Sequence, residues 1–170
     1  MRLYLMRHAE AFPSSLPSIA DDAVRPLTDS GRTQARRSVE GLRRLKLDIR
    51  MIVTSPFRRA IETAKEAADV LEMKVAIREW PELTPDTDPK ETSRRLGELS
   101  TTAGVLFVGH EPHMSSWISE LVSEGAVQCL MKKAAVACIQ VDKLPPPTGN
   151  GELRWLLSPK QLALIGKSTA

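Results

Sequence analysis

The sequence predicts an α/β protein with a three-layer αβα architecture and a mostly parallel central sheet. Two observations support this fold class. Short continuous apolar segments, which suit strands buried on both faces, alternate with longer segments whose apolar residues recur every three or four positions, as on one face of a helix. Strands that alternate with helices form parallel sheets covered on both faces. The 170 residues suit one domain, and we expect residues 1–170 to form it.

Four apolar segments in the first two thirds of the chain are predicted to be strands, because each runs without a polar interruption. These segments are Leu3–Met6, Met51–Val53, Val75–Ile77 and Val105–Val108.

Helices are predicted between and after these strands. The first follows Thr28, a suitable N-cap, and the second covers Phe57–Leu71. The third covers Pro89–Leu99, because proline is favoured in the first turn of a helix, and the fourth follows Pro112.

The C-terminal third has a different pattern. Ala135–Val141 and Leu153–Leu157 resemble strands, and "KLPPPTGNG" between them is rich in turn residues. We therefore expect a hairpin that closes the sheet.

Composition excludes several classes of protein. The 24 basic and 21 acidic residues are spread along the chain, and three Phe, three Trp and one Tyr are too few for a basic surface with stacking aromatics. Nucleic acid is therefore not an expected partner. The apolar run Leu3–Met6 is too short for a signal peptide or a membrane span, so we expect a cytoplasmic protein. Cys129 and Cys138 have no metal-binding spacing and are expected to be reduced packing residues.

Basic and imidazole side chains follow three of the predicted strands. Arg7 and His8 follow the first strand, "TSPFRRAIETA" with Arg58 follows the second, and His110 follows "VLFV". In open α/β sheets, ligands bind beyond the carboxyl ends of the strands. Each residue alone could be a solvated cap or a packing residue, but together they indicate an anion pocket without a metal.

Phosphoryl transfer to nitrogen suits such a pocket, with one histidine as the nucleophile and the other as a hydrogen-bond donor. A nucleophilic histidine must be neutral. We therefore expect the neighbouring Arg7 and Arg58 to lower the pKa of His8.

Four blocks of sequence resemble the histidine phosphatase superfamily, which has the phosphoglycerate-mutase-like fold. They are "LYLMRHAEA" at 3–11, "RPLTDSGRTQA" at 25–35, "SPFRRAIETA" at 55–64 and "VGHEP" at 108–112. The resemblance implies that His8 is phosphorylated, that Arg7 and Arg58 bind the phosphate, and that His110 completes the pocket. The sequence departs from the family at Ala9, where glycine is usual.

The branch of the family is indicated by chain length. Only 51 residues lie between Arg58 and His110, which leaves no room for the lid insertions of the larger mutases and acid phosphatases. The short chain, together with "VRPLT" and "PELTP", resembles the phosphohistidine phosphatases. That resemblance implies a cofactor-independent hydrolase that acts on a phosphohistidine of a signalling phosphotransfer protein.

Three further residues have two interpretations each. Arg25 is a phosphate or substrate contact by the resemblance, or a surface residue held extended before Pro26. Glu82 in "WPELTP" resembles the family's general acid, or is a carboxylate paired with a local cation. His113 in "HEPH" is a metal ligand or a surface histidine at the start of a helix, and because it does not have the zinc-helix spacing we expect the second and no metal site.

Two other functions stay open from the sequence. The same chemistry could act on small phosphoesters or sugar phosphates, whereas a mutase is disfavoured because it benefits from a closed site. The chain could also be a non-catalytic adaptor that binds phosphorylated ligands.

Overall fold

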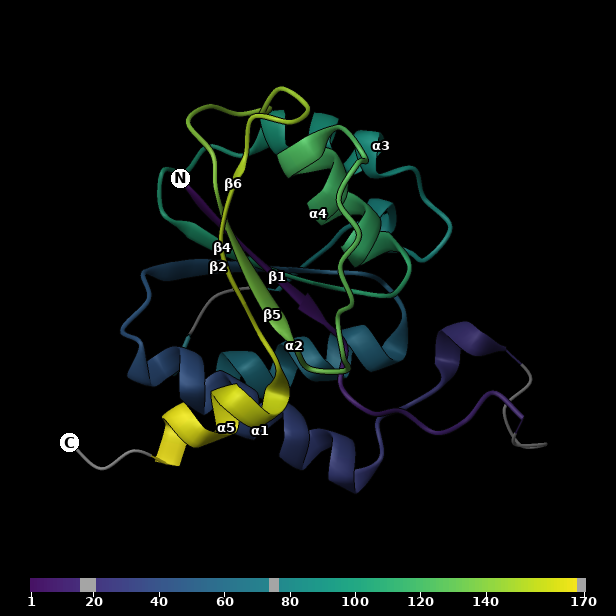
Figure 1. Cartoon of the computed structure of the whole chain (residues 1–170). Helices are drawn as coiled ribbons and strands as arrows, with labels where there is room; N and C mark the ends of the chain where they lie inside the picture. Colours follow the sequence, from purple (N-terminus) through teal and green to yellow (C-terminus); the bar gives the residue numbers. More distant parts are fainter. Residues whose placement is uncertain (16–20, 74–76, 168–170) are drawn as a thin grey trace.

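A sheet with strand order β3-β2-β4-β1-β5-β6 forms the centre of the computed structural model, which describes residues 1–15, 21–73 and 77–167 (Figure 1). The strands are β1 (Arg2–Arg7), β2 (Ile49–Thr54), β3 (Arg78–Glu79), β4 (Gly104–Gly109), β5 (Val136–Gln140) and β6 (Glu152–Leu157). The first four pair in parallel, while β5 pairs antiparallel with both β1 and β6. The sheet is therefore mostly parallel, and the predicted hairpin closes one side of it.

Helices cover both faces of the sheet, as Figure 1 shows. They are α1 (Asp29–Arg44), α2 (Arg58–Val70), α3 (Pro89–Arg95), α4 (His113–Ser123) and α5 (Pro159–Lys167), with single 3-10 turns at Asp22–Val24, Pro81–Leu83 and Leu96–Glu98. Buried side chains of α1, α2 and α5 form one core on one face, and those of α4 belong to a second core on the other. The predicted three-layer αβα fold is confirmed.

The two cores follow directly from strand geometry, because successive side chains of a strand point to opposite faces. In β1, Tyr4 and Met6 belong to the core beneath α1 and α2, while Leu3 and Leu5 belong to the core beneath α4. Continuous apolar strands are thus required by burial on both faces.

Helix α1 begins where the sequence predicts. The Thr28 hydroxyl accepts a hydrogen bond from the Gly31 backbone N–H at 3.0 Å, as an N-cap side chain does. Further along, α1 contacts α5 so closely that a Cβ added to Gly41 would lie 2.4 Å from the Leu162 carbonyl oxygen. Glycine at 41 therefore permits the two helices to pack backbone against backbone.

The structure differs from the prediction in three elements. Residues 75 and 76 of the predicted third strand lie outside the described residues, and the strand that pairs with β2 is Arg78–Glu79. The predicted helix Pro89–Leu99 is α at Pro89–Arg95 and tightens into a 3-10 turn at Leu96–Glu98. Helix α5 was not predicted, because its nine residues bury only Leu162 and so give almost no periodic signal.

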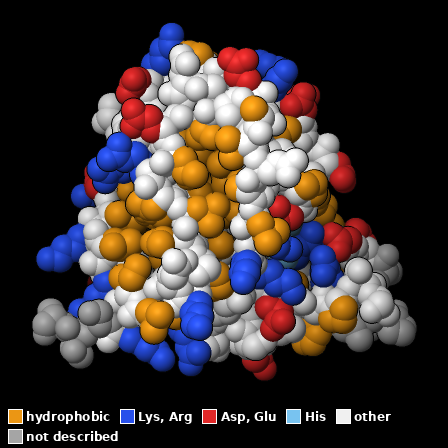
Figure 2. Space-filling view, viewed as in Figure 1, with side chains coloured by type: hydrophobic (Ala, Val, Ile, Leu, Met, Phe, Trp, Pro, Cys, Tyr) orange, Lys and Arg blue, Asp and Glu red, His pale blue; other side chains and the backbone are white. Residues whose placement is uncertain are grey.

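Strand β6 lies at the edge of the sheet, and its side chains are exposed or half-buried. Figure 2 shows apolar side chains gathered in the middle of this face, where β6 runs in Figure 1. Within the described residues, no helix has the length and apolar character needed to cross a membrane.

Candidate functional site

Three neighbouring parallel strands end at the same edge of the sheet and bring the site together. Arg7 at the end of β1 is in register with Gly109 at the end of β4, so His8 and His110 follow at adjacent positions. Their ring centroids are 5.0 Å apart. Ser55 follows β2, and its hydroxyl lies 2.8 Å from His110 Nε2. The structure thus places side by side the two histidines that the sequence singled out.

The backbone of Ala9 determines which nitrogen of His8 is free. Nδ1 of His8 lies 2.7 Å from the Ala9 carbonyl oxygen, which can only accept, so Nδ1 carries the proton. Nε2 then has the lone pair and accepts from Arg59 Nε at 3.2 Å. The Ala9 N–H donates to the Thr63 hydroxyl at 3.1 Å, and Ala9 is fully buried without a positive φ. The position therefore does not need the conformational freedom of glycine.

The arginine that contacts His8 is Arg59. The prediction that Arg58 lies beside His8 is wrong. Arg58 is exposed on the outer face of α2, where Nε donates to Glu62 at 2.8 Å, an i,i+4 ion pair. Arg59, one residue further and about 100° around the helix, is buried with 3% of its side-chain surface exposed. The signal was present in the sequence, since Arg59 shares the buried helix face with Thr63 and Arg58 shares the outer face with Glu62.

Asp22, which the sequence reasoning missed, holds two arginines at the site. Its carboxylate lies 2.9 Å from Arg59 Nη2 and 2.8 Å from Arg25 Nη2, and its backbone oxygen accepts from Arg59 Nη1 at 2.7 Å. Arg25 also donates to the Phe12 carbonyl at 2.9 Å. The contacts to Asp22 and Phe12 fix Arg25 near the other site residues, which favours the substrate-contact interpretation over a surface residue held only by Pro26.

Three nitrogens around the histidines are buried without a hydrogen-bond partner among the described residues: Arg7 Nε, Arg25 Nε and His110 Nδ1. Arg7 is anchored through Nη1, which donates to the Met131 carbonyl at 2.8 Å. Buried polar nitrogens are normally satisfied, and the two guanidinium N–H groups of this cluster can only donate, so they need an acceptor. An oxyanion would supply several acceptor atoms at once.

Burial controls the protonation of both histidines. Burial, together with the positive charges of Arg59, Arg7 and Arg25, lowers the pKa of His8 to about 3. Burial also lowers the pKa of His110 to about 2, with smaller contributions from His8 and Arg59. His8 is therefore neutral at physiological pH, as a nucleophile must be. Of the two arginines predicted to lower the pKa of His8, Arg7 does so, whereas Arg59 and Arg25 act in place of Arg58.

Glu82 and His113 lie in other networks. Glu82 Oε1 accepts from Arg95 Nη1, and no hydrogen bond joins Glu82 to His8 or His110 in the part of the chain that the structure describes. Pairing with Arg95 favours the interpretation of Glu82 as a carboxylate held by a local cation.

His113 is at the start of α4, as expected, but the prediction of a surface position is wrong, because the side chain is buried. Its Nε2 lies 3.1 Å from the Thr92 hydroxyl and its Nδ1 lies 3.0 Å from the Thr87 carbonyl oxygen. Both ring nitrogens are thus occupied by hydrogen bonds within the protein. The described residues contain no group of three or more His, Cys, Asp or Glu side chains that could hold a metal ion.

The fold and the site together define a class: a three-layer α/β protein whose parallel strands end in a cluster of two neutral histidines and three arginines. The family model of the histidine phosphatase superfamily (branch 1) matches residues 3–84. The chain is also 32% identical over 166 residues to the phosphohistidine phosphatase SixA of Escherichia coli, a match that covers 96% of this chain and 98% of SixA. The chain belongs to the histidine phosphatase superfamily.

Solved structures agree with this membership. A structure of the protein histidine phosphatase SixA complexed with tungstate superposes with a TM-score of 0.84 at 32% identity, covering 95% of this chain and 99% of that one. The α-ribazole phosphatase of Shigella flexneri superposes with a TM-score of 0.70 at 19% identity, covering 94% and 97%. At that lower identity the second likeness concerns the fold alone.

Proposed function

We propose that this protein is a cytoplasmic phosphohistidine phosphatase that removes phosphate from a histidine of a phosphotransfer signalling protein through a phosphohistidine intermediate on His8. The observation that carries the proposal is the neutral His8 ring, whose Nε2 lone pair faces Arg59 among buried donors that lack acceptors. The likeness to SixA, named as a phosphohistidine phosphatase and solved with the oxyanion tungstate, supports it.

The reaction has two steps in this proposal. His8 Nε2 attacks the phosphorus, a bond forms between them, and the bond from phosphorus to the substrate imidazole breaks. The His8 ring becomes a phosphorylated cation, whose Nδ1–H is held by the Ala9 carbonyl. Water then attacks the phosphorus, Nε2 leaves with its electron pair, and phosphate takes up the water oxygen while a proton passes to solvent or phosphate.

The leaving group does not need an enzymatic acid in this reaction. A substrate imidazole has a reference pKa of about 6.5, so its second nitrogen can already carry a proton, and the ring departs neutral. The arrangement of Glu82, which is paired with Arg95, is compatible with such a site. A phosphoester would release an alkoxide that must be protonated, which makes small esters the weaker candidate substrates.

We assign stabilisation of the transferring phosphoryl group to Arg7, Arg25 and Arg59, with Arg58 removed from this role, and a donated hydrogen bond to His110 Nδ1. Ser55 Oγ accepts from the Phe57 N–H at 3.3 Å, and donation of its own proton to His110 Nε2 would place the ring proton on Nδ1. Donors fixed before reaction stabilise developing charge without reorganisation.

The test is turnover of a phosphotransfer domain phosphorylated on histidine, compared between wild type and His8→Ala. We expect the variant to lose activity by about 10³-fold or more, since no other group can form the intermediate. Acid-quenched wild type should carry the phosphoryl group on His8. Label on another residue, or activity that survives His8→Ala, would overturn the mechanism. Binding of the phosphorylated domain without any turnover by wild type would favour the adaptor.

A further inference from the structure

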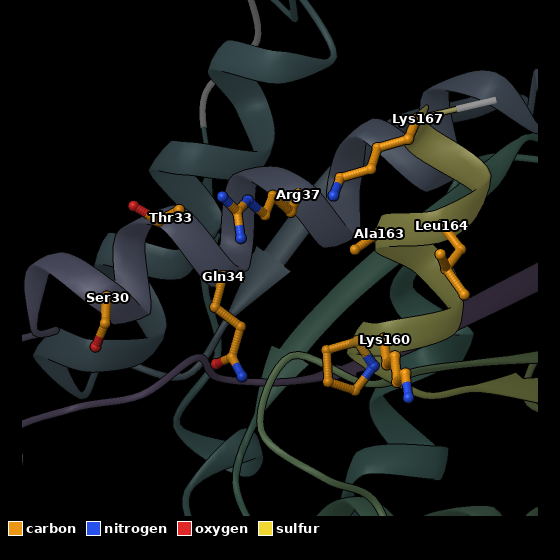
Figure 3. Close-up of a pocket in the computed structure, with 9 residues that line it drawn as sticks. Ser30, Thr33, Gln34, Arg37, Lys160, Ala163, Leu164 and Lys167 are labelled. Atoms are coloured by element: carbon orange, nitrogen blue, oxygen red, sulfur yellow. The ribbon is translucent and has the colours of Figure 1, made fainter. Parts of the chain in front are cut away.

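A groove of about 680 Å³ runs between α1 and α5, outside the site at the strand ends (Figure 3). It is lined by side chains of Ser30, Thr33, Gln34, Arg37, Pro159, Lys160, Ala163, Leu164 and Lys167. Most of the surface that lines the groove is apolar, and Arg37, Lys160 and Lys167 lie around it. Leu164 is 60% exposed, a large area for a leucine side chain with polar neighbours.

The cations of this groove differ from those on the other side of the same helix. Arg32 and Arg36 of α1 face α2 and pair with Glu62 and Glu66 at 2.8 to 3.5 Å. Arg37, Lys160 and Lys167 have no carboxylate partner within the ranges that the structure describes. Figure 3 shows the Lys167 chain extending from α5 toward α1, which bears Arg37. The groove therefore concentrates uncompensated positive charge.

The groove adjoins the catalytic pocket through Glu10. The Gln34 side-chain oxygen accepts from the Glu10 backbone N–H at 3.1 Å, and the Ser30 hydroxyl donates to the Glu10 carboxylate. Glu10 is two residues after His8, so their Cα atoms are less than about 8 Å apart. Any protein whose phosphohistidine enters the pocket must cover surface close to this groove.

We propose that the α1–α5 groove is the docking site for an acidic amphipathic helix of the phosphorylated protein substrate. The inference rests on the proposed function and extends it to the surface that recognises the partner. A helix laid between two helices would cover Leu164 with apolar side chains and place carboxylates against Arg37, Lys160 and Lys167. Electrostatic complementarity of this kind raises the rate of encounter and selects acidic partners.

A second copy of this chain suits the groove less well. A symmetric contact would set the same surface against itself, and cations would then face cations. The chain also has a net charge of +3, which opposes self-association.

The test compares two substrates for wild type and the triple variant Arg37→Glu, Lys160→Glu, Lys167→Glu. The substrates are an acidic phosphotransfer domain phosphorylated on histidine and free phosphohistidine. We expect the variant to raise KM for the domain by about 10-fold or more with little change in kcat, and to hydrolyse free phosphohistidine within about twofold of wild type. Retained turnover of the small substrate also demonstrates that the variant folds.

The matched control reverses three exposed cations at the opposite end of the sheet, Arg44, Lys46 and Lys143, and so makes the same change in net charge. It should keep the wild-type KM for the domain. An equal KM increase in both triple variants, or no increase in either, would overturn the docking site while leaving the proposed function intact. If wild type hydrolyses neither substrate, the proposed function itself fails, and the docking site fails with it.

Discussion

Two basic regions of this molecule, the pocket at the strand ends and the α1–α5 groove, carry similar side chains in opposite environments. In the pocket, Arg59 is buried and held by Asp22. In the groove, Arg37, Lys160 and Lys167 extend from exposed helix positions. Buried charges cost free energy unless they are paired, whereas exposed charges are solvated and screened by salt.

This difference in burial determines which part of the reaction each region can affect. Fixed and desolvated donors can stabilise a transferring phosphoryl group, because they do not need to reorganise during the reaction. Mobile and solvated cations contribute to encounter and partner choice and contribute little to chemistry. Substitutions should therefore affect kcat in the pocket and KM for a protein substrate in the groove.

The largest contrast is expected between the adjacent residues Arg59 and Arg58. Arg59→Ala removes the guanidinium that contacts His8 Nε2 and should lower kcat/KM for free phosphohistidine by about 10²- to 10³-fold. Arg58→Ala removes only an exposed ion pair with Glu62 and should change it by no more than about twofold. Steady-state kinetics on both variants measures this directly.

Asp22→Asn serves as the intermediate case for the same measurement, because it weakens the hold on Arg59 without removing the guanidinium. Its kcat/KM should lie between those of Arg59→Ala and Arg58→Ala. If Arg58→Ala were the more damaging of the two alanine variants, the assignment of Arg59 to the phosphoryl group would be wrong.

A second contrast concerns pH, because burial lowers the pKa of His8 and of His110 far below 6.5. As pH falls below about 6.5, these histidines take up protons in the unfolded chain and not in the folded protein, so stability decreases with decreasing pH. Each contributes a slope of at most about 1.4 kcal/mol per pH unit. Urea unfolding at pH 7.0, 6.0 and 5.5 should therefore give a shallower slope for His110→Asn than for wild type. Equal slopes would contradict the neutral buried state of His110. Arg58→Ala provides the control, since the guanidinium that it removes stays protonated throughout this pH range.

Much of the fold and half of the site could be predicted from the sequence, because both depend on short apolar segments and on the residues that directly follow them. Continuous apolar segments identified β1, β2 and β4. Because ligands bind beyond the carboxyl ends of such strands, His8 after β1 and His110 after β4 could be selected as candidate site residues. The choice between Arg58 and Arg59 needed the helical phase of α2, which two adjacent arginines leave ambiguous unless Glu62 and Thr63 are read with them.

Other features depend on contacts between distant segments. Asp22 reaches Arg59 across 37 residues, and nothing in its neighbourhood in the sequence indicates that contact. The groove needs α5, whose only buried residue is Leu162, so neither the helix nor the surface it makes with α1 could be predicted. Catalytic motifs are compact in sequence, whereas this surface is assembled from both ends of the chain.

The smallest contrast expected is in salt dependence. Raising NaCl from about 50 mM to 500 mM shortens the Debye length from roughly 14 Å to 4 Å, which screens exposed charges and affects buried ones much less. We expect KM for the acidic phosphorylated domain to rise about three- to tenfold, with kcat/KM for free phosphohistidine changing by about twofold or less. The groove triple variant should lose most of the salt effect on the domain. A salt effect that persists in that variant would place the attractive charges elsewhere, and the most direct next candidates would be the arginines at the mouth of the pocket, where Arg25 is partly exposed.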